Sequence, residues 1–241
     1  MRRTIRRLAA VVLVALVAFG LTAGGLRLAR TPPAPIAHLT ATESPEPTAG
    51  GASAITAPPV GSLELEDGAG RRLVSMAADQ VRAIGSVAKT MTALVLLDAF
   101  PLAPGEPGAT YTITAADVAD YRATIAANGS NLPVSLGEQL TERDLLLGLM
   151  LPSANNLADT AARWTAGDLA AFVARLNARA AVLGMAHTHF DDASGFSPGT
   201  VSTAEDLVRL GRAALTNPGL ADIVSTAKAA LPPDGAQYYN L

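Results

Sequence analysis

The sequence IGSVAKTMTALVLLDAF, residues 84–100, is apolar on nearly every side when it is wound as a helix. Such a helix has no face that favours water, so we expect it to be buried at the centre of the fold. It nevertheless carries Lys89, one of only two lysines beside sixteen arginines in the chain. Arginine keeps its proton, whereas a desolvated lysine loses one more easily and can act as a base. The use of lysine at this position therefore indicates a role as a catalytic base.

Ser86 lies three residues before Lys89, at the start of the same predicted helix. Residues three apart share one helix face, so the hydroxyl of Ser86 and the amine of Lys89 can meet. The positive end of the helix dipole would also favour a developing alkoxide at Ser86. The pair therefore supplies a candidate nucleophile and a candidate base.

The same Ser-x-x-Lys spacing occurs a second time, at Ser225–Lys228. This copy follows Asn217-Pro218-Gly219 and precedes Pro232-Pro233, and nothing after it could complete a site. We interpret it as a solvated helix end without a catalytic role.

A third candidate element is Ser153-Ala154-Asn155, the only Ser-x-Asn in the chain. It follows Leu151-Pro152, where proline interrupts one predicted helix before the next begins. A loop at this place can direct both polar side chains into a cleft. The alternative is that Ser153 or Asn155 only caps the following helix. We favour the functional interpretation because of the Ser86–Lys89 pair upstream.

The remaining patterns predict a mixed α/β fold around the buried helix. We expect short strands at 62–66, 72–76 and 110–114, and further helices at 115–121, 142–150, 154–164, 169–183 and 203–215. Thr114 is placed to cap one of these helices, and Thr141 with Asp144 forms a capping box for another. After residue 215, only a helix end at Ser225–Lys228 is predicted. An α/β sandwich whose sheet is completed by C-terminal strands missing from this sequence would fit that order.

The N-terminal residues predict export. Arg2–Arg7 is a basic cluster, and Leu8–Leu26 follows without a charge over a length that can cross a bilayer. Arginines before the span favour a cytoplasmic N-terminus and place the rest of the chain outside. We expect residues 1–30 to be a membrane anchor, with a cleaved signal peptide as the alternative. Residues 31–60 are rich in Pro, Thr, Ala and Gly and predict a semi-extended stalk.

Composition excludes several classes of function. The chain has no cysteine, which excludes disulfides and thiolate chemistry. Residues 31–241 carry 12 basic against 21 acidic side chains, a balance that disfavours nucleic-acid binding. His187 and His189 could share one face of a strand but lack a clear third ligand, so we expect no metal and no cofactor.

The motifs together resemble the serine-type D-alanyl-D-alanine carboxypeptidases, the low-molecular-mass penicillin-binding proteins. The resemblance covers about residues 61–241. It rests on Ser86-Val87-Ala88-Lys89 with the residues after it, on Leu145–Met150 with Ser153-Ala154-Asn155, and on segments at 183–185, 188–190, 194–196 and 202–207. Penicillin-recognising enzymes combine a Ser-x-x-Lys motif with Ser-Asp-Asn and Lys-Thr-Gly.

The resemblance implies a β-lactamase/transpeptidase-like fold, with an antiparallel sheet flanked by helices and an all-helical lobe. It implies that Ser86 is the nucleophile, Lys89 the base, Ser153 a proton relay and Asn155 a substrate ligand. The substrates would be peptidoglycan stem peptides, and β-lactams would inhibit.

One part of the family pattern is absent from this sequence. No Lys-Thr-Gly occurs in the chain, so we expect the last motif and the last strands to lie beyond Leu241. Two rival functions remain open, a class A-like β-lactamase and an inactive wall-binding relative. The β-lactamase is disfavoured because Ala154 is the middle residue of the second motif and Glu205 is the only glutamate after Glu142.

Overall fold

The computed structural model describes residues 60–240. The basic cluster, the apolar span and all but the last residue of the expected stalk lie outside the described residues. Within residues 60–240, no helix is both long enough and apolar enough to cross a bilayer.

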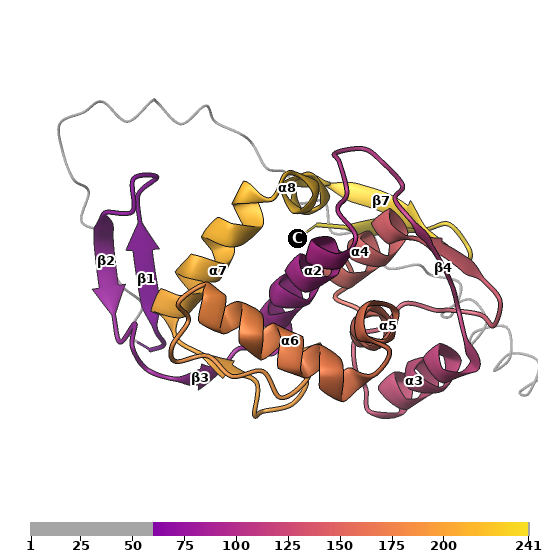
Figure 1. The fold of residues 1–241 in the computed structure, drawn as a ribbon, viewed down its shortest axis with the longest axis horizontal. Helices are drawn as coiled ribbons and strands as arrows, with labels where there is room; N and C mark the ends of the chain where they lie inside the picture. The colour runs from indigo at the N-terminus through magenta and orange to yellow at the C-terminus, as the bar shows by residue number, and fades with distance from the viewer. Residues whose placement is uncertain (1–59, 241) are drawn as a thin grey trace, which may run out of the picture. The chain divides into compact units, whose positions relative to one another are not determined.

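The described chain has a mixed α/β architecture in which helices predominate, as the sequence predicts (Figure 1). The helices are α2 (Ala88–Ala99), α3 (Ala115–Ala126), α4 (Glu142–Met150), α5 (Asn155–Ala166), α6 (Leu169–Val182), α7 (Ala204–Thr216) and α8 (Pro218–Ser225), and a 3-10 turn, η1 (Gly85–Val87), precedes α2. The strands are β1 (Leu63–Glu66), β2 (Arg72–Met76), β3 (Arg82–Ala83), β4 (Thr110–Thr112), β5 (Gln139–Thr141), β6 (Val201–Ser202), β7 (Lys228–Leu231) and β8 (Ala236–Tyr239).

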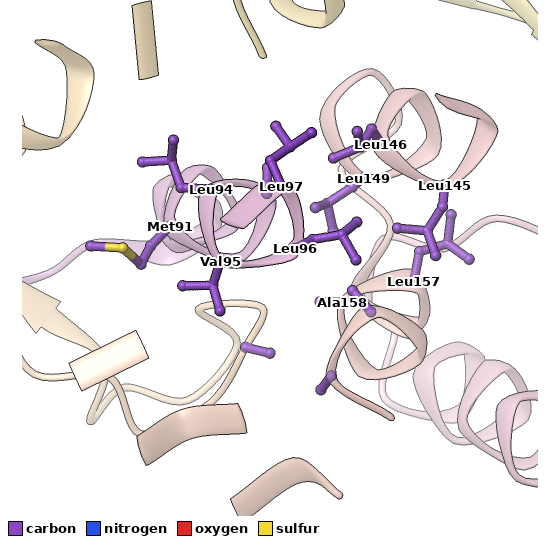
Figure 2. Packing of buried hydrophobic residues seen from close by; sticks show 14 of the residues in the cluster. Met91, Leu94, Val95, Leu96, Leu97, Leu145, Leu146, Leu149, Leu157 and Ala158 are labelled. Atoms are coloured by element: carbon purple, nitrogen blue, oxygen red, sulfur yellow. The ribbon is translucent and has the colours of Figure 1, made fainter. Parts of the chain in front are cut away.

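Helix α2 lies at the centre of the helices, and the predicted buried helix is thereby confirmed. It packs against α4, α5, α6, α7 and α8 (Figure 1). Figure 2 shows Leu96 pointing toward α4 and α5, where Leu149 and Ala158 lie. All three side chains are buried. Burying a leucine contributes about 1.5–3 kcal/mol, so an all-apolar helix is stable only where neighbours cover every face.

The strands form four separate antiparallel pairs in the described part of the chain. The predicted hairpin β1–β2 is present and contacts α7. Strand β4 pairs with β5, which ends directly before α4. Strand β3 pairs with β6, and this pair connects two segments that are distant in sequence. Strand β3 lies directly before η1, and β6 directly follows the 189–200 loop.

Two helices begin at caps that the sequence predicts, and in the structure both caps are capping boxes. The hydroxyl of Thr114 accepts the Asp117 N–H, and the Asp117 carboxylate accepts the Thr114 N–H at 2.8 Å. Thr141 and Asp144 repeat the arrangement at α4. Such caps satisfy N–H groups that the helix leaves free. Helix α3 runs to Ala126, five residues further than predicted.

Beyond residue 215, where the sequence predicts only a helix end at Ser225–Lys228, the structure has a complete helix and a hairpin. Helix α8 begins at Pro218, with the Asn217 side chain accepting the Leu220 N–H at 3.0 Å, and the hairpin β7–β8 follows. Asn-Pro starts this helix because the asparagine caps it and proline has no N–H that would need a partner. The strands of the hairpin have only four residues each, too few for a clear alternating pattern.

Candidate active site

Ser86 and Lys89 meet at the entrance to α2. Ser86 is exposed within the η1 turn, and Lys89 lies in the first turn of α2 with 1% of its surface exposed. The Lys89 Nζ donates a hydrogen bond to Ser86 Oγ at 3.0 Å. Ser86 therefore belongs to the 3-10 turn before the α-helix rather than to its first turn, and the spacing of three residues still brings the two groups together.

The second hydrogen bond of Lys89 comes from a loop distant in sequence. Its Nζ donates to the backbone carbonyl of Ser194, also at 3.0 Å. Burial lowers the pKa of Lys89 to about 8, although the carboxylates of Asp192 and Asp159 act in the opposite direction. With that pKa, about a tenth of Lys89 is neutral at pH 7, against less than a thousandth for a free lysine. A neutral amine within hydrogen-bond distance of a serine hydroxyl can accept its proton.

The loop that supplies the Ser194 carbonyl is organised by Asp192. Its carboxylate accepts hydrogen bonds from the backbone N–H groups of Ser194, Gly195 and Phe196, and from two hydroxyls, those of Ser194 and Thr200. These bonds lower the pKa of Asp192 despite its burial, so it stays ionised. In the sequence, the segment 194–196 stands out only through the family resemblance. Its contact with Lys89 carries no local signal, since the two residues are 105 positions apart.

Gly195 allows this loop to pass close to the turn that carries Ser86. Its φ is +76°, and a Cβ at this position would lie well inside van der Waals contact of the Gly85 carbonyl oxygen. Only glycine satisfies both conditions without displacing the backbone. The approach fixes η1 against the loop, and so fixes Ser86 relative to Ser194.

Ser153 and Asn155 lie where α4 ends and α5 begins. Ser153 has φ +59°, which is uncommon for a residue other than glycine. Its Oγ is buried and has no hydrogen-bond partner within the described part of the chain. Leaving a buried hydroxyl unpaired costs about 1–3 kcal/mol, so strain and an orphaned group coincide at one residue.

Asn155 is the first residue of α5 and is 9% exposed. Its backbone N–H donates to the Ser130 carbonyl at 2.7 Å, but no residue from 60 to 240 is hydrogen-bonded to its side-chain amide. Neither residue acts as the side-chain cap of α5, because the cap position is Ala154. The capping alternative therefore does not explain the motif.

A cleft of about 350 Å³ lies beside these groups. Its walls come from α3, from the first two turns of α5 and from the loop at 192–197. Asn155 and Ser194 both line it, which connects the second motif to the carbonyl that holds Lys89. Ser153 has no hydrogen bond to Ser86 or Lys89 among the described residues. The structure thus joins Ser86 with Lys89, and places Asn155 on the adjoining cleft wall.

Asp159 also lines the cleft, although no sequence pattern predicts it. It lies one turn after Asn155 on α5. Burial, with Asp192 adding a smaller effect, raises its pKa to about 6. An Asp four residues after the motif is a common helix residue, so nothing in the sequence distinguishes it.

The second Ser-x-x-Lys does not form a site. Ser225 ends α8 and its hydroxyl donates to the Asp222 carbonyl at 2.9 Å, whereas Lys228 begins β7. Both side chains are exposed and they are not hydrogen-bonded to each other. No group of three or more His, Cys, Asp or Glu that could hold a metal occurs between residues 60 and 240.

Comparison with known proteins identifies the family of this chain. The family model described as D-alanyl-D-alanine carboxypeptidase matches residues 60–231. A D-alanyl-D-alanine carboxypeptidase of Mycobacterium tuberculosis is 34% identical over 193 residues, covering 74% of this chain and 62% of its own. One from Streptomyces is 35% identical over 185 residues, with 73% and 62% covered. The chain therefore spans less than two thirds of the length of these relatives.

Solved structures show the same fold. A D-alanyl-D-alanine carboxypeptidase of M. tuberculosis superposes with a TM-score of 0.66 at 31% identity, covering 78% of this chain and 70% of the other. A variant of a Streptomyces DD-transpeptidase gives a TM-score of 0.62 at 31% identity, covering 75% and 71%. The fold is that of the penicillin-binding DD-peptidases, which confirms the predicted fold class. The chain belongs to the D-alanyl-D-alanine carboxypeptidase family, as its motifs predicted.

The close approach at Gly195 leads to a prediction. Gly195→Ala should lower thermal stability more than Gly184→Ala. Both glycines have positive φ, +76° and +70°, but a Cβ at Gly184 meets nothing within 4 Å. The shared φ strain costs about 1 kcal/mol at each site, and the backbone clash at Gly195 adds to it. Thermal unfolding followed by circular dichroism measures the difference; equal melting temperatures would contradict the close packing.

Proposed function

We propose that this protein is a serine acyl-enzyme hydrolase that removes the terminal D-alanine from peptidoglycan stem peptides and is acylated by penicillins. The observation that carries the proposal is the 3.0 Å hydrogen bond between the buried Lys89 Nζ and Ser86 Oγ. It supports the proposal because an amine of lowered pKa lies against an exposed serine hydroxyl, and the family membership supports the reaction class.

The proposed reaction has two steps. In the first, Ser86 Oγ attacks the carbonyl carbon of the penultimate D-alanine while the neutral Lys89 accepts the hydroxyl proton. The peptide C–N bond breaks, the proton passes to the leaving amine, and D-alanine departs from an ester on Ser86. In the second step, a water gives a proton to the base and hydrolyses that ester. The backbone N–H of Ser86 is among the donors expected to stabilise the oxyanion.

Ser153 and Asn155 have supporting roles in this proposal. The unpaired Ser153 hydroxyl would take part in proton transfer to the leaving amine, and the free Asn155 amide would bind the substrate backbone. Both groups lack partners in the free protein, and a bound peptide would supply them. This is the arrangement expected where local strain serves a ligand.

A β-lactamase remains the rival enzyme, and the position of Glu205 argues against it. A β-lactamase of the class A type needs a carboxylate that activates the deacylating water. Glu205, the only glutamate after Glu142, contacts Arg209 at 2.9 Å and Arg72 at 3.7 Å, next to the β1–β2 hairpin. We therefore propose slow deacylation of penicillins. The inactive wall-binding relative is tested by the acylation experiments below.

For the N-terminal part, we propose that residues 1–30 anchor the protein in the membrane and that residues 31–60 form a stalk. Residues 61–241 would then act outside the cell membrane. The charge pattern of the sequence supports this, and the family match begins at residue 60, where the proposed stalk ends.

The first test concerns the nucleophile. A fluorescent penicillin should label the protein on Ser86, as mapped by mass spectrometry of the modified peptide. Ser86→Ala should abolish labelling, and Ser225→Ala, in the matching but exposed motif, should leave it unchanged. A label on Ser225, or one that persists in Ser86→Ala, would show that the assignment is wrong.

The second test concerns the base. The rate of penicillin acylation should rise with pH to a half-maximum near 8, because only the neutral amine of Lys89 accepts a proton. Below that pH the rate should fall about tenfold per unit. Lys89→Arg should lower the rate by about 100-fold or more, since guanidinium stays charged.

Lys228→Arg is the matched control and should change neither the rate nor its pH profile, since Lys228 is exposed. Similar losses in the two variants, or a flat profile in the unaltered protein, would contradict the role of Lys89.

The third test concerns the anchor. Expressed in a bacterium, the full chain should fractionate with the membrane and retain its N-terminal residues, because the uncharged span is long enough for a bilayer. Intact-mass measurement of the membrane fraction checks this. Recovery of a shortened, soluble product would favour the cleaved signal peptide instead.

A further inference from the structure

The cleft beside the candidate active site has an acidic lining. Asp120, Asp159 and Asp192 line it, and no lysine or arginine is among the described residues that do. The three carboxylates differ in what they contact. Asp120 pairs with Arg163, and Asp192 accepts five hydrogen bonds from its own loop.

The Asp159 carboxylate alone of the three has no partner. Its backbone carbonyl accepts a hydrogen bond from Arg163, but its side chain takes part in no hydrogen bond or ion pair within residues 60–240. Asp159 is half-buried and lines the cleft, so its carboxylate is available to a ligand. A partly desolvated carboxylate without a partner favours a cation next to it.

A second, independent feature supports a ligand along this wall. Asn155 is 9% exposed, lines the same cleft and has an amide without a hydrogen-bond partner in the described chain. Asp159 follows it by four residues on α5, so the two side chains share one helix face about 6 Å apart along the axis. A peptide bound to the Asn155 amide therefore extends past Asp159.

The rest of the cleft suits an aliphatic chain that ends in a charge. Ala123 of α3 and Ala127, directly after α3, line it, and so does Phe196, of which 58% is exposed. Apolar surface of this kind accommodates the methylene groups of a long amine side chain, whose charged end then reaches a polar group. The cleft volume of about 350 Å³ is enough for one such side chain with part of its backbone.

We propose that Asp159 binds the side-chain ammonium of a diamino acid that precedes the D-alanyl-D-alanine end of the substrate. The inference rests on the proposed carboxypeptidase function and narrows its substrates to stem peptides whose side-chain amine is free. A stem peptide whose amine is already acylated, as in a cross-link, loses this contact. Asp159 is thus a specificity-determining residue.

The charge of Asp159 predicts how the preference depends on pH. The groups around it are Lys89 from α2, Asp117 and Asp120 from α3, Arg163 on its own helix and Asp192 from the loop. Burial and the neighbouring carboxylates raise its pKa to about 6, and Lys89 acts against them. The carboxylate is therefore ionised above that pH, and the preference for an ammonium should be present there and decline as the pH falls through 6.

The test compares two peptides as competitors of acylation by a fluorescent penicillin. One is Nα-acetyl-L-Lys-D-Ala-D-Ala, and the other carries a second acetyl group on the lysine Nε. At pH 7.5 the free amine should compete at about fivefold lower concentration than the acetylated one, the ratio for an ion pair of about 1 kcal/mol. Because both peptides are measured at the same pH, the titration of Lys89 cancels in the ratio.

Asp159→Asn should bring the ratio close to one by weakening only the free-amine peptide, and Asp159→Glu should keep the preference. Asp98→Asn is the control for net charge, since Asp98 lies at the opposite end of α2 and pairs with Arg179. It should leave the ratio unchanged. In the unaltered protein the ratio should also fall toward one as the pH is lowered from 7.5 to 5. This second test uses no substitution.

Two outcomes would overturn the inference while leaving the proposed function intact. One is equal competition by the two peptides at pH 7.5 in a protein that penicillin labels at Ser86. The other is a preference that persists in Asp159→Asn or at pH 5. A protein that penicillin does not label, and for which neither peptide competes, would overturn the proposed function itself and this inference with it.

Discussion

The site depends on burying one amine, that of Lys89, at the start of the most apolar helix. A buried lysine is costly when charged and tolerable when neutral, so the fold itself lowers the pKa. The two hydrogen bonds of Nζ, to Ser86 Oγ and to the Ser194 carbonyl, fix its direction. The lowered pKa of the amine and its direction toward the serine are therefore consequences of the same packing of α2 among its neighbours.

The loop at 191–197 keeps that arrangement in place. The Asp192 carboxylate accepts hydrogen bonds from three backbone N–H groups and two hydroxyls. The Ser194 carbonyl remains free to accept a hydrogen bond from Lys89. Thr92 of α2 adds a hydrogen bond to the Ala193 carbonyl at 2.6 Å, one turn after Lys89. The loop is thus attached to α2 at successive turns, and Gly195 lets it reach the Gly85 backbone. A change in this loop is therefore transmitted to the turn that carries Ser86.

Two side chains without partners line the cleft, and a third lies just before α5. Ser153 is strained and its hydroxyl is unpaired, the Asn155 amide is free, and the Asp159 carboxylate has no partner. Elsewhere, buried polar groups such as Asp117 are fully bonded, with Thr114, Tyr111 and Thr160 all donating to it. Polar groups without partners are costly, so the unpartnered side chains of Asn155 and Asp159 on one cleft wall support a binding role for that wall.

The sequence by itself determined the local features. Helix α2, the caps at Thr114 and Thr141, and the spacing of Ser86 and Lys89 follow from patterns only a few residues long, where propensity and hydrogen bonding act between near neighbours. The sequence already favoured Ser86–Lys89 over the second Ser-x-x-Lys, but only the tertiary structure shows why the two copies differ. The same spacing at Ser225–Lys228 is split between a helix end and a strand, and neither residue is covered by other segments. The Ser194 carbonyl and the unpartnered Asp159 likewise depend on long-range packing, because burial and the distance between remote residues are not encoded in any short stretch of chain.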